Sequence, residues 1–156
     1  MYTLLIVDDE PNVLIGMKAL IDWESYGVMR IETATNCSDA LVRAVDTHPQ
    51  IALIDVCIGK EFGQDLVKRI RDSGVDCACI MMSGHREFGY AIEALRCGAW
   101  DYLLKPVQAD KLREAVEHII REKLHGTVRQ APKDDTPDPI ISRKASEMPT
   151  LINKLL

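Results

Sequence analysis

The sequence predicts an α/β fold, namely a doubly wound five-stranded parallel sheet flanked by five helices. Short apolar runs alternate with amphipathic stretches five times along the first 124 residues, and this alternation is typical of repeated β-α units. The apolar runs are unbroken, which indicates strands that are buried on both faces. Because β-α-β crossovers are right-handed, the helices cover both faces and ligands bind where the strands end.

Five apolar runs are the expected strands: residues 3–7, 28–34, 51–54, 78–82 and 100–104. Glycine, proline or polar residues bound these runs, as expected for strands that end in turns.

Five amphipathic stretches are the expected helices. The first begins at Pro11 after Asp9 or Glu10 as a cap, because proline suits the first helical position. The others cover residues 38–47, the stretch after Gly63, residues 87–97 and residues 109–124. The residues expected to face inward are Val13, Leu14, Met17, Leu20, Ile21, Leu41, Ala44, Val45, Leu66, Val67, Ile70, Phe88, Ala91, Ile92, Leu95, Leu112, Val116, Ile119 and Ile120.

Composition excludes several classes of protein. With 47% hydrophobic and 28% charged residues the chain reads as an ordinary globular protein. No apolar run approaches the roughly 18 residues of a membrane span, and the N-terminus lacks the basic region of a signal peptide. We therefore expect a cytoplasmic protein without a membrane partner. The net charge of −5 and the dispersed basic residues disfavour a nucleic-acid surface within this chain.

The chain divides into three parts. Residues 1–124 carry the β-α repeats and are expected to form one domain. Residues 125–149 are rich in proline, charged and small residues, and are interpreted as a linker. Residues 150–156 could begin a further helix or a tail, and an output domain is absent from these 156 residues.

The five cysteines do not indicate a disulfide framework, because their number is odd and the chain looks cytosolic. Cys77 and Cys79 point the same way if they lie in a strand, but no second Cys/His pair follows at zinc spacing. We favour small buried thiols over a metal or redox role.

Polar residues gather at the predicted strand ends. Strand one ends in Asp8-Asp9-Glu10, strand three in Asp55 and strand four in Ser83-Gly84, while strand five leads into Lys105-Pro106. Carboxylates that converge in this way repel each other unless cations lie among them. Mg²⁺ and the Lys105 ammonium would supply that charge. One carboxylate could then act as a nucleophile on phosphorus.

These motifs together resemble the response-regulator receiver family over residues 1–124. The matching residues, in order, are Val7-Asp8-Asp9-Glu10, Asp55, Gly63 eight residues later, Ser83-Gly84 and Tyr102-Leu103-Leu104-Lys105-Pro106. The resemblance implies a flavodoxin-like receiver fold and a phosphorylation switch.

The resemblance also implies residue roles. Asp55 matches the phospho-acceptor, and Lys105 matches the lysine that pairs with the phosphoryl group. Ser83 and Tyr102 match the switch hydroxyl and the switch aromatic. Mg²⁺ would be held by Asp8, Asp9, Asp55 and the backbone carbonyl of Cys57, with Asp9 the more direct ligand of the acidic pair. The Lys105–Pro106 peptide, with Pro106, matches one that is usually cis in this family.

Some positions depart from the family pattern. Ile58 and Gly59 replace a frequent Met-Pro pair, and Ser83 stands where threonine is commoner. Cys57 and His85 occupy the positions that influence dephosphorylation, and neither is a carboxylate or an amide that could orient water. A phosphoryl group on Asp55 is therefore expected to last at least minutes.

The resemblance implies a sensor histidine kinase as phosphate donor. It implies no enzymatic activity beyond Mg²⁺-dependent phosphotransfer to the chain itself and slow dephosphorylation. The helix 4–strand 5–helix 5 face is the expected partner surface, including a homodimer. Residues 20–27 resemble receivers of AraC-type transcription factors, so DNA would be reached only through an output domain not in this chain.

Two alternatives remain open. A stand-alone receiver could act through protein contacts or pass phosphate onward in a phosphorelay. A phosphatase that uses an aspartyl phosphate is disfavoured. Its motif has two aspartates separated by one residue at the first strand's end, whereas Asp8 and Asp9 are adjacent.

Overall fold

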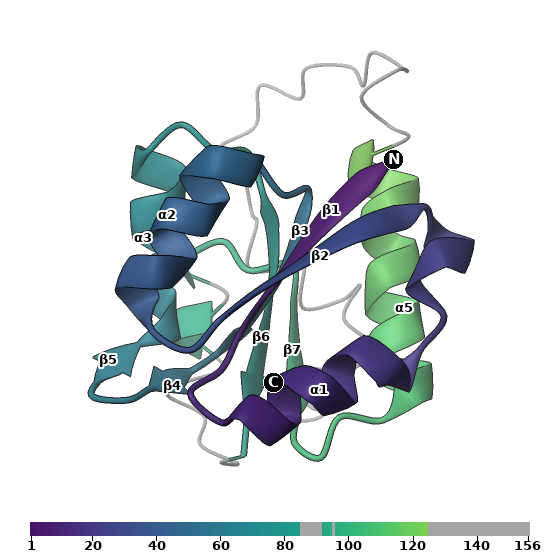
Figure 1. The fold of residues 1–156 in the computed structure, drawn as a ribbon, viewed down its shortest axis with the longest axis horizontal. Helices are drawn as coiled ribbons and strands as arrows, with labels where there is room; N and C mark the ends of the chain where they lie inside the picture. Colours follow the sequence, from purple (N-terminus) through teal and green to yellow (C-terminus); the bar gives the residue numbers. More distant parts are fainter. Residues whose placement is uncertain (85–91, 95, 125–156) are drawn as a thin grey trace.

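Five parallel strands form the centre of the molecule, in the order β2-β1-β3-β6-β7 (Figure 1). This computed structural model describes residues 1–84, 92–94 and 96–124. The strands are β1 (Tyr2–Val7), β2 (Val28–Ala34), β3 (Ile51–Asp55), β6 (Ala78–Ser83) and β7 (Asp101–Leu104). All four strand pairings are parallel. The predicted fold class is confirmed, because this order is one of the two common doubly wound arrangements.

Helices cover both faces of the sheet. α1 (Pro11–Leu20) and α5 (Ala109–Ile119) lie on one face, and α2 (Cys37–Thr47) and α3 (Gly63–Asp72) lie on the other (Figure 1). In the helix expected at 87–97, residues 92–94 and 96 are helical and Cys97 lies in a turn, while residues 87–91 and 95 lie outside the described residues. So do the segments expected to be a linker, 125–149, and a further helix or tail, 150–156.

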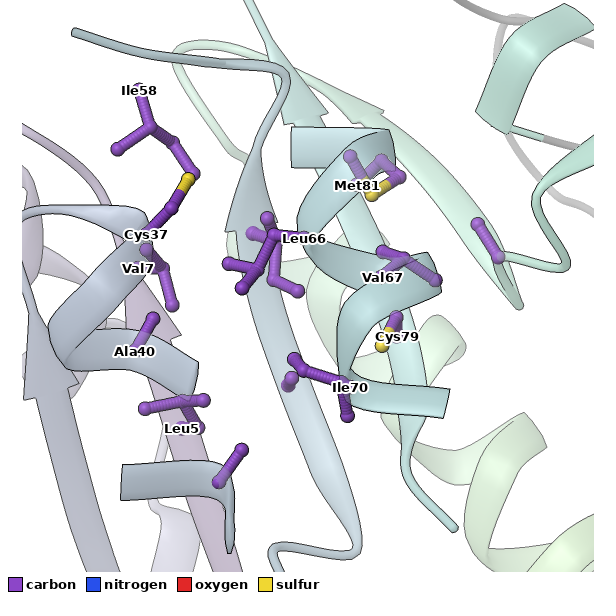
Figure 2. Close-up of a cluster of buried hydrophobic side chains, with 14 of the residues drawn as sticks. Leu5, Val7, Cys37, Ala40, Ile58, Leu66, Val67, Ile70, Cys79 and Met81 are labelled. Atoms are coloured by element: carbon purple, nitrogen blue, oxygen red, sulfur yellow. The ribbon is translucent and has the colours of Figure 1, made fainter. Parts of the chain in front are cut away.

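Alternating side chains of each strand build two core layers, one under each pair of helices. Leu4 and Ile6 of β1 pack in the layer that includes residues of α1 and α5. Leu5 and Val7, one residue out of phase, pack in the layer beneath α2 and α3. Figure 2 shows this second layer. β3 and β6 are buried along their whole length, whereas β2 at the edge of the sheet is partly exposed and contains Arg30 and Glu32, so the expected unbroken apolar pattern does not hold for β2.

One predicted inward residue is wrong. Val45 of α2 is 43% exposed. Cys37, Ala40 and Ala44 form the buried stripe of this helix instead. Val45 follows Ala44 directly, so helical geometry turns it about 100° away from that stripe.

Three short elements were not predicted. The expected loop between Gly59 and Gly63 contains two short antiparallel strands, β4 (Cys57–Ile58) and β5 (Glu61–Phe62). Gly59 takes a φ of +60° between them, a conformation that glycine adopts readily. The third is a 3₁₀ helix over Trp23–Tyr26. The helix predicted at 109–124 is present as α5, which continues as a π-helical turn over Ile120–Leu124.

None of the helices in the described part of the chain has the length and apolar character needed to cross a membrane.

Candidate functional site

The carboxyl ends of the central strands bring four polar residues to one edge of the sheet. β3 ends at Asp55 and β6 at Ser83, while Asp8 and Lys105 directly follow β1 and β7. The backbone N–H of Lys105 donates to the Ser83 carbonyl over 2.8 Å. Parallel pairing therefore holds all four residues at the same level, in the crevice where doubly wound folds bind ligands.

The Lys105 ammonium lies between two carboxylates. Its Nζ is 2.5 Å from Asp8 Oδ2 and 2.9 Å from Asp55 Oδ2. Asp8 is fully buried and Asp55 is only 8% exposed. Water and salt screen a buried pair of this kind far less than a surface pair. The structure thus brings together the acidic and basic strand ends that the sequence places at this edge.

The pKa values of this group reflect an excess of negative charge in a buried site. Burial raises the pKa of Asp55, and the neighbouring Asp8 carboxylate adds to the rise, while Lys105 opposes it. Burial alone would lower the pKa of Lys105, but its hydrogen bonds to Asp8 and Asp55 outweigh burial and raise it. Two buried carboxylates share one ammonium, so a further cation would be stabilised here.

Three acidic side chains form a group beside this pair. One carboxylate oxygen each from Asp8, Asp9 and Glu10 lie within 4.8 Å of one another. The Asp9 carboxylate also accepts the Gly59 N–H over 3.1 Å. In residues 1–84, 92–94 and 96–124 this is the only such group of three potential metal ligands. Hard carboxylate oxygens are the donors that Mg²⁺ prefers, so the residues present fit that ion.

The segment after Asp55 returns to the carboxylate. The Cys57 N–H points at Asp55 Oδ1 over 3.5 Å, the long limit of a hydrogen bond. The structure therefore places Cys57 beside the acceptor candidate, as its position two residues later suggests.

The two switch candidates are both buried in this conformation. Ser83 is 1% exposed at the end of β6, and Tyr102 is 2% exposed within the core layer under α2 and α3. The Lys105–Pro106 peptide bond is cis. All three features lie on β6, β7 or the turn that follows β7, adjacent to Lys105.

Sequence reasoning missed the structural role of one residue beside the site, Gly63, and of one at the start of β7, Asp101. Gly63 starts α3 so close to β3 that a Cβ there would overlap the Asp55 carbonyl oxygen. Asp101 is 2% exposed, and its carboxylate accepts the Tyr102 N–H over 2.7 Å. The spacing of Gly63 from Asp55 was a usable signal, whereas a single acidic residue at a strand start offers none.

Comparison with known proteins points to one family. The response regulator receiver domain family matches residues 4–117. The transcriptional regulatory protein YesN of Bacillus subtilis is 37% identical over 122 residues, which are 78% of this chain and 33% of YesN. The regulatory protein AtoC of Escherichia coli is 33% identical over 76% of this chain and 25% of its own length. This chain thus spans between a quarter and a third of each of these relatives.

A solved structure agrees. The receiver domain of AraT, a response regulator from Geobacillus stearothermophilus, is 32% identical with a TM-score of 0.74, covering 82% of this chain and 98% of that domain. The family match, the structural match, the parallel sheet and the acidic crevice around Lys105 agree with one another. The chain belongs to the response regulator receiver domain family.

Proposed function

We propose that Asp55 is the phospho-acceptor of this receiver domain and that a sensor histidine kinase is the donor. The observation that carries the proposal is the Lys105 ammonium bound to both Asp8 and Asp55 at the carboxyl edge of the sheet. In the transfer, a carboxylate oxygen of Asp55 forms a bond to phosphorus while the phosphorus–nitrogen bond of the phosphohistidine breaks. Lys105 is already placed to balance charge on the transferred group.

The neighbouring residues would respond to the new phosphoryl group. We assign to Ser83 the hydroxyl that binds a phosphoryl oxygen, because Ser83 ends β6 and its carbonyl accepts the Lys105 N–H. Tyr102 is the aromatic residue whose packing reports that change, since it lies on β7, the strand that pairs with β6. The switch is then a shift between two populated packings of one fold.

Mg²⁺ is the cation that the acidic group would hold. Asp8, Asp9 and Asp55, with the Cys57 backbone carbonyl, are the proposed ligands. When bound, Mg²⁺ would offset the negative charge of the carboxylates and of the incoming phosphoryl group. Two contacts in the site do not involve the ion. Lys105 orients Asp55, and Asp9 holds the β4–β5 hairpin through the Gly59 N–H.

The wider assignment extends the family membership. We infer that the chain is no general enzyme and that its chemistry is limited to its own phosphorylation and slow dephosphorylation. Two of its relatives carry the word regulatory in their names, and YesN is a transcriptional one. A cytoplasmic location, a transcriptional output through a separate DNA-binding domain, and a homodimer through the fourth helix, β7 and α5 belong to the same proposal.

The test uses beryllium fluoride, which mimics an aspartyl phosphate, with Mg²⁺. Binding is followed by tryptophan fluorescence and by sedimentation for wild type, Asp55→Asn and Asp46→Asn. Asp46 is an exposed aspartate in the last turn of α2, before the start of β3, whereas Asp55 ends β3, so Asp46 is a matched control. We expect wild type and Asp46→Asn to bind and Asp55→Asn to fail, and chelation of Mg²⁺ should abolish binding by wild type and by Asp46→Asn.

Other outcomes would decide against the proposal. Binding by Asp55→Asn would place the acceptor elsewhere. Failure of all three folded proteins to bind would mean that the crevice is not a working phosphoryl site.

A further inference from the structure

A cavity of about 340 Å³ lies at the opposite end of β6 from Ser83. Its wall includes Val67 and Ile70 of α3, the Cys77 and Cys79 thiols, Trp100 and Lys123. Figure 2 shows Cys79 beside Val67 and Ile70. The cavity is therefore separate from the acidic crevice at Asp55, and nothing in the proposed phosphorylation uses it.

The two cysteines reach this cavity from the same side of one extended segment. Cys77 directly precedes β6 and Cys79 lies within it, so their side chains point the same way. Cys79 is 3% exposed, while Cys77 is only partly buried. The Cys79 thiol donates to the Cys77 carbonyl over 3.8 Å. The pair thus presents two sulfur atoms from neighbouring positions at the wall of one cavity.

The surroundings keep the Cys77 thiol protonated. The hydrogen bond with Cys79 is the largest cause that raises the pKa of Cys77, and burial adds to it. A ligand that required two free thiolates beforehand would therefore meet a cost at neutral pH. A ligand that condenses with protonated thiols would not.

The ligand count argues against a structural zinc ion. Zinc takes four protein ligands in such sites. Throughout the described part of the chain, the only cluster of three or more potential metal ligands is the acidic group at Asp8, on the other edge. In the described residues, Cys77 and Cys79 therefore offer two sulfur ligands without a third protein ligand beside them. This arrangement suits an atom that binds two sulfurs of the protein.

We propose that Cys77 and Cys79 form a dithiol site for a trivalent arsenical that carries one organic substituent. The reaction is a condensation: two arsenic–sulfur bonds form, the arsenic–oxygen bonds break, and the two thiol protons leave with that oxygen as water. Arsenic stays trivalent and no oxidant is needed. The product is neutral, so it adds no charge beside Arg71, Asp76 and Lys123, which also line the cavity.

The rest of the cavity would hold the organic group. Val67, Ile70 and the Trp100 indole offer apolar and aromatic surface to a phenyl ring. Lys123 also lines the cavity, with Nζ 2.5 Å from Asp76 Oδ1 and 6.0 Å from the centre of the Trp100 ring. Lys123 and Asp76 neutralise each other's charge in this ion pair. We therefore expect the cavity to bind an uncharged ligand.

The test uses phenylarsine oxide on the full 156-residue protein, read by intact mass and by tryptic peptide mapping. Cleavage after Arg71 and Arg86 gives one peptide, residues 72–86, that holds both cysteines, whereas Cys37, Cys57 and Cys97 fall in three other peptides. We expect one phenylarsenic group per chain on peptide 72–86. Dithiothreitol should remove it, and glutathione at the same thiol concentration should not. This mapping of wild type does not depend on whether a variant folds.

Variants give the second arm. Cys77→Ser and Cys79→Ser should each lose the glutathione-resistant group, while Cys37→Ser, which alters a buried thiol of α2, should keep it. Circular dichroism shows which variants are folded. The proposal is overturned by an absence of the group in wild type, by its appearance on another peptide, or by its persistence in folded Cys77→Ser or Cys79→Ser.

Discussion

The Lys105 ammonium nitrogen lies 2.9 Å from Oδ2 of Asp55, and the same nitrogen bonds the fully buried Asp8. Lys105→Met would leave two buried carboxylates without their cation. We expect this change to lower the free energy of unfolding by about 3 kcal/mol in metal-free buffer, the typical result of removing one partner from a buried ion pair. Urea denaturation measures it.

A double-mutant cycle measures how much of the stability lost in Lys105→Met comes from the interaction with Asp55. In an Asp55→Asn background only Asp8 remains charged beside residue 105, so Lys105→Met should cost about 1 kcal/mol less than in wild type. Lys111→Met is the control, because Lys111 faces Glu114 across 3.8 Å on exposed α5, and its loss should stay within about 0.5 kcal/mol. An equal cost of Lys105→Met in both backgrounds would contradict the coupling.

Gly63→Ala should be strongly destabilising. The new Cβ would overlap the Asp55 carbonyl oxygen and lie 2.9 Å from both the Ile54 and Met81 side chains. Because a backbone atom cannot move aside as a flexible side chain can, we expect a loss of about 2–3 kcal/mol in the free energy of unfolding. The measurement is urea denaturation.

The chain supplies its own control for that substitution. Gly16 is an exposed glycine in the middle of α1, and a Cβ there would meet nothing within 4 Å. Gly16→Ala should therefore stabilise the protein by about 0.5–1 kcal/mol through helix propensity alone. Similar effects of the two substitutions would refute the close approach of α3 to β3.

The sheet and the crevice could be predicted from sequence because they depend on order along the chain. β2 occupies the predicted residues 28–34 and begins directly after Gly27, which takes a φ of +83°. Consecutive β-α units make the strands parallel, so their carboxyl ends lie at the same edge of the sheet regardless of side-chain packing. The convergence of Asp8, Asp55 and Lys105 can therefore be predicted without knowing which atoms they contact.

The parts that were not predicted depend on contacts between distant residues. β4 and β5 have two residues each, too few to show a period. The overlap that keeps Gly63 a glycine comes from Asp55 and Met81. The strand pattern puts Cys77 and Cys79 on one side, but their cavity is completed by Trp100 and Lys123.

Glu32 should make stability depend on pH in the acidic range. Its carboxylate lies 2.6 Å from Arg30 Nε and 3.0 Å from Arg43 Nη1. The hydrogen bond to Arg30 is the main cause that lowers the pKa of Glu32. A lowered folded-state pKa adds stability above the unfolded value, about 4.3, and that stability is lost as the pH falls through the folded value.

The measurement compares wild type with Glu32→Gln from pH 7 down to pH 3. We expect the variant to be less stable by about 0.5 kcal/mol at pH 7, since both arginines are solvent-exposed, and the difference to vanish at low pH. Glu114→Gln, which removes one contact of 3.8 Å on α5, should show a smaller difference. A difference that grew as the pH fell would reverse the sign argued here.

Arg71 and Gly98 should show strong coupling. The Arg71 guanidinium donates to the Cys97 carbonyl, where a helical segment ends, and it fills the space that a Cβ on Gly98 would need. Gly98 also takes a φ of +89°. Gly98→Ala therefore carries two costs in wild type, about 1 kcal/mol of left-handed backbone strain and the displacement of Arg71 from its acceptor.

In an Arg71→Ala background only the backbone cost remains, so Gly98→Ala should cost about 1 kcal/mol less there than in wild type. Thermal or urea denaturation of the four proteins measures this coupling. Gly74→Ala serves as the reference for strain alone, because Gly74 has a φ of +86° and open space where its Cβ would lie. If Gly98→Ala cost no more in wild type than Gly74→Ala does, Arg71 would not be held at Gly98. The link from α3 to the Cys97 carbonyl would then contribute nothing to stability.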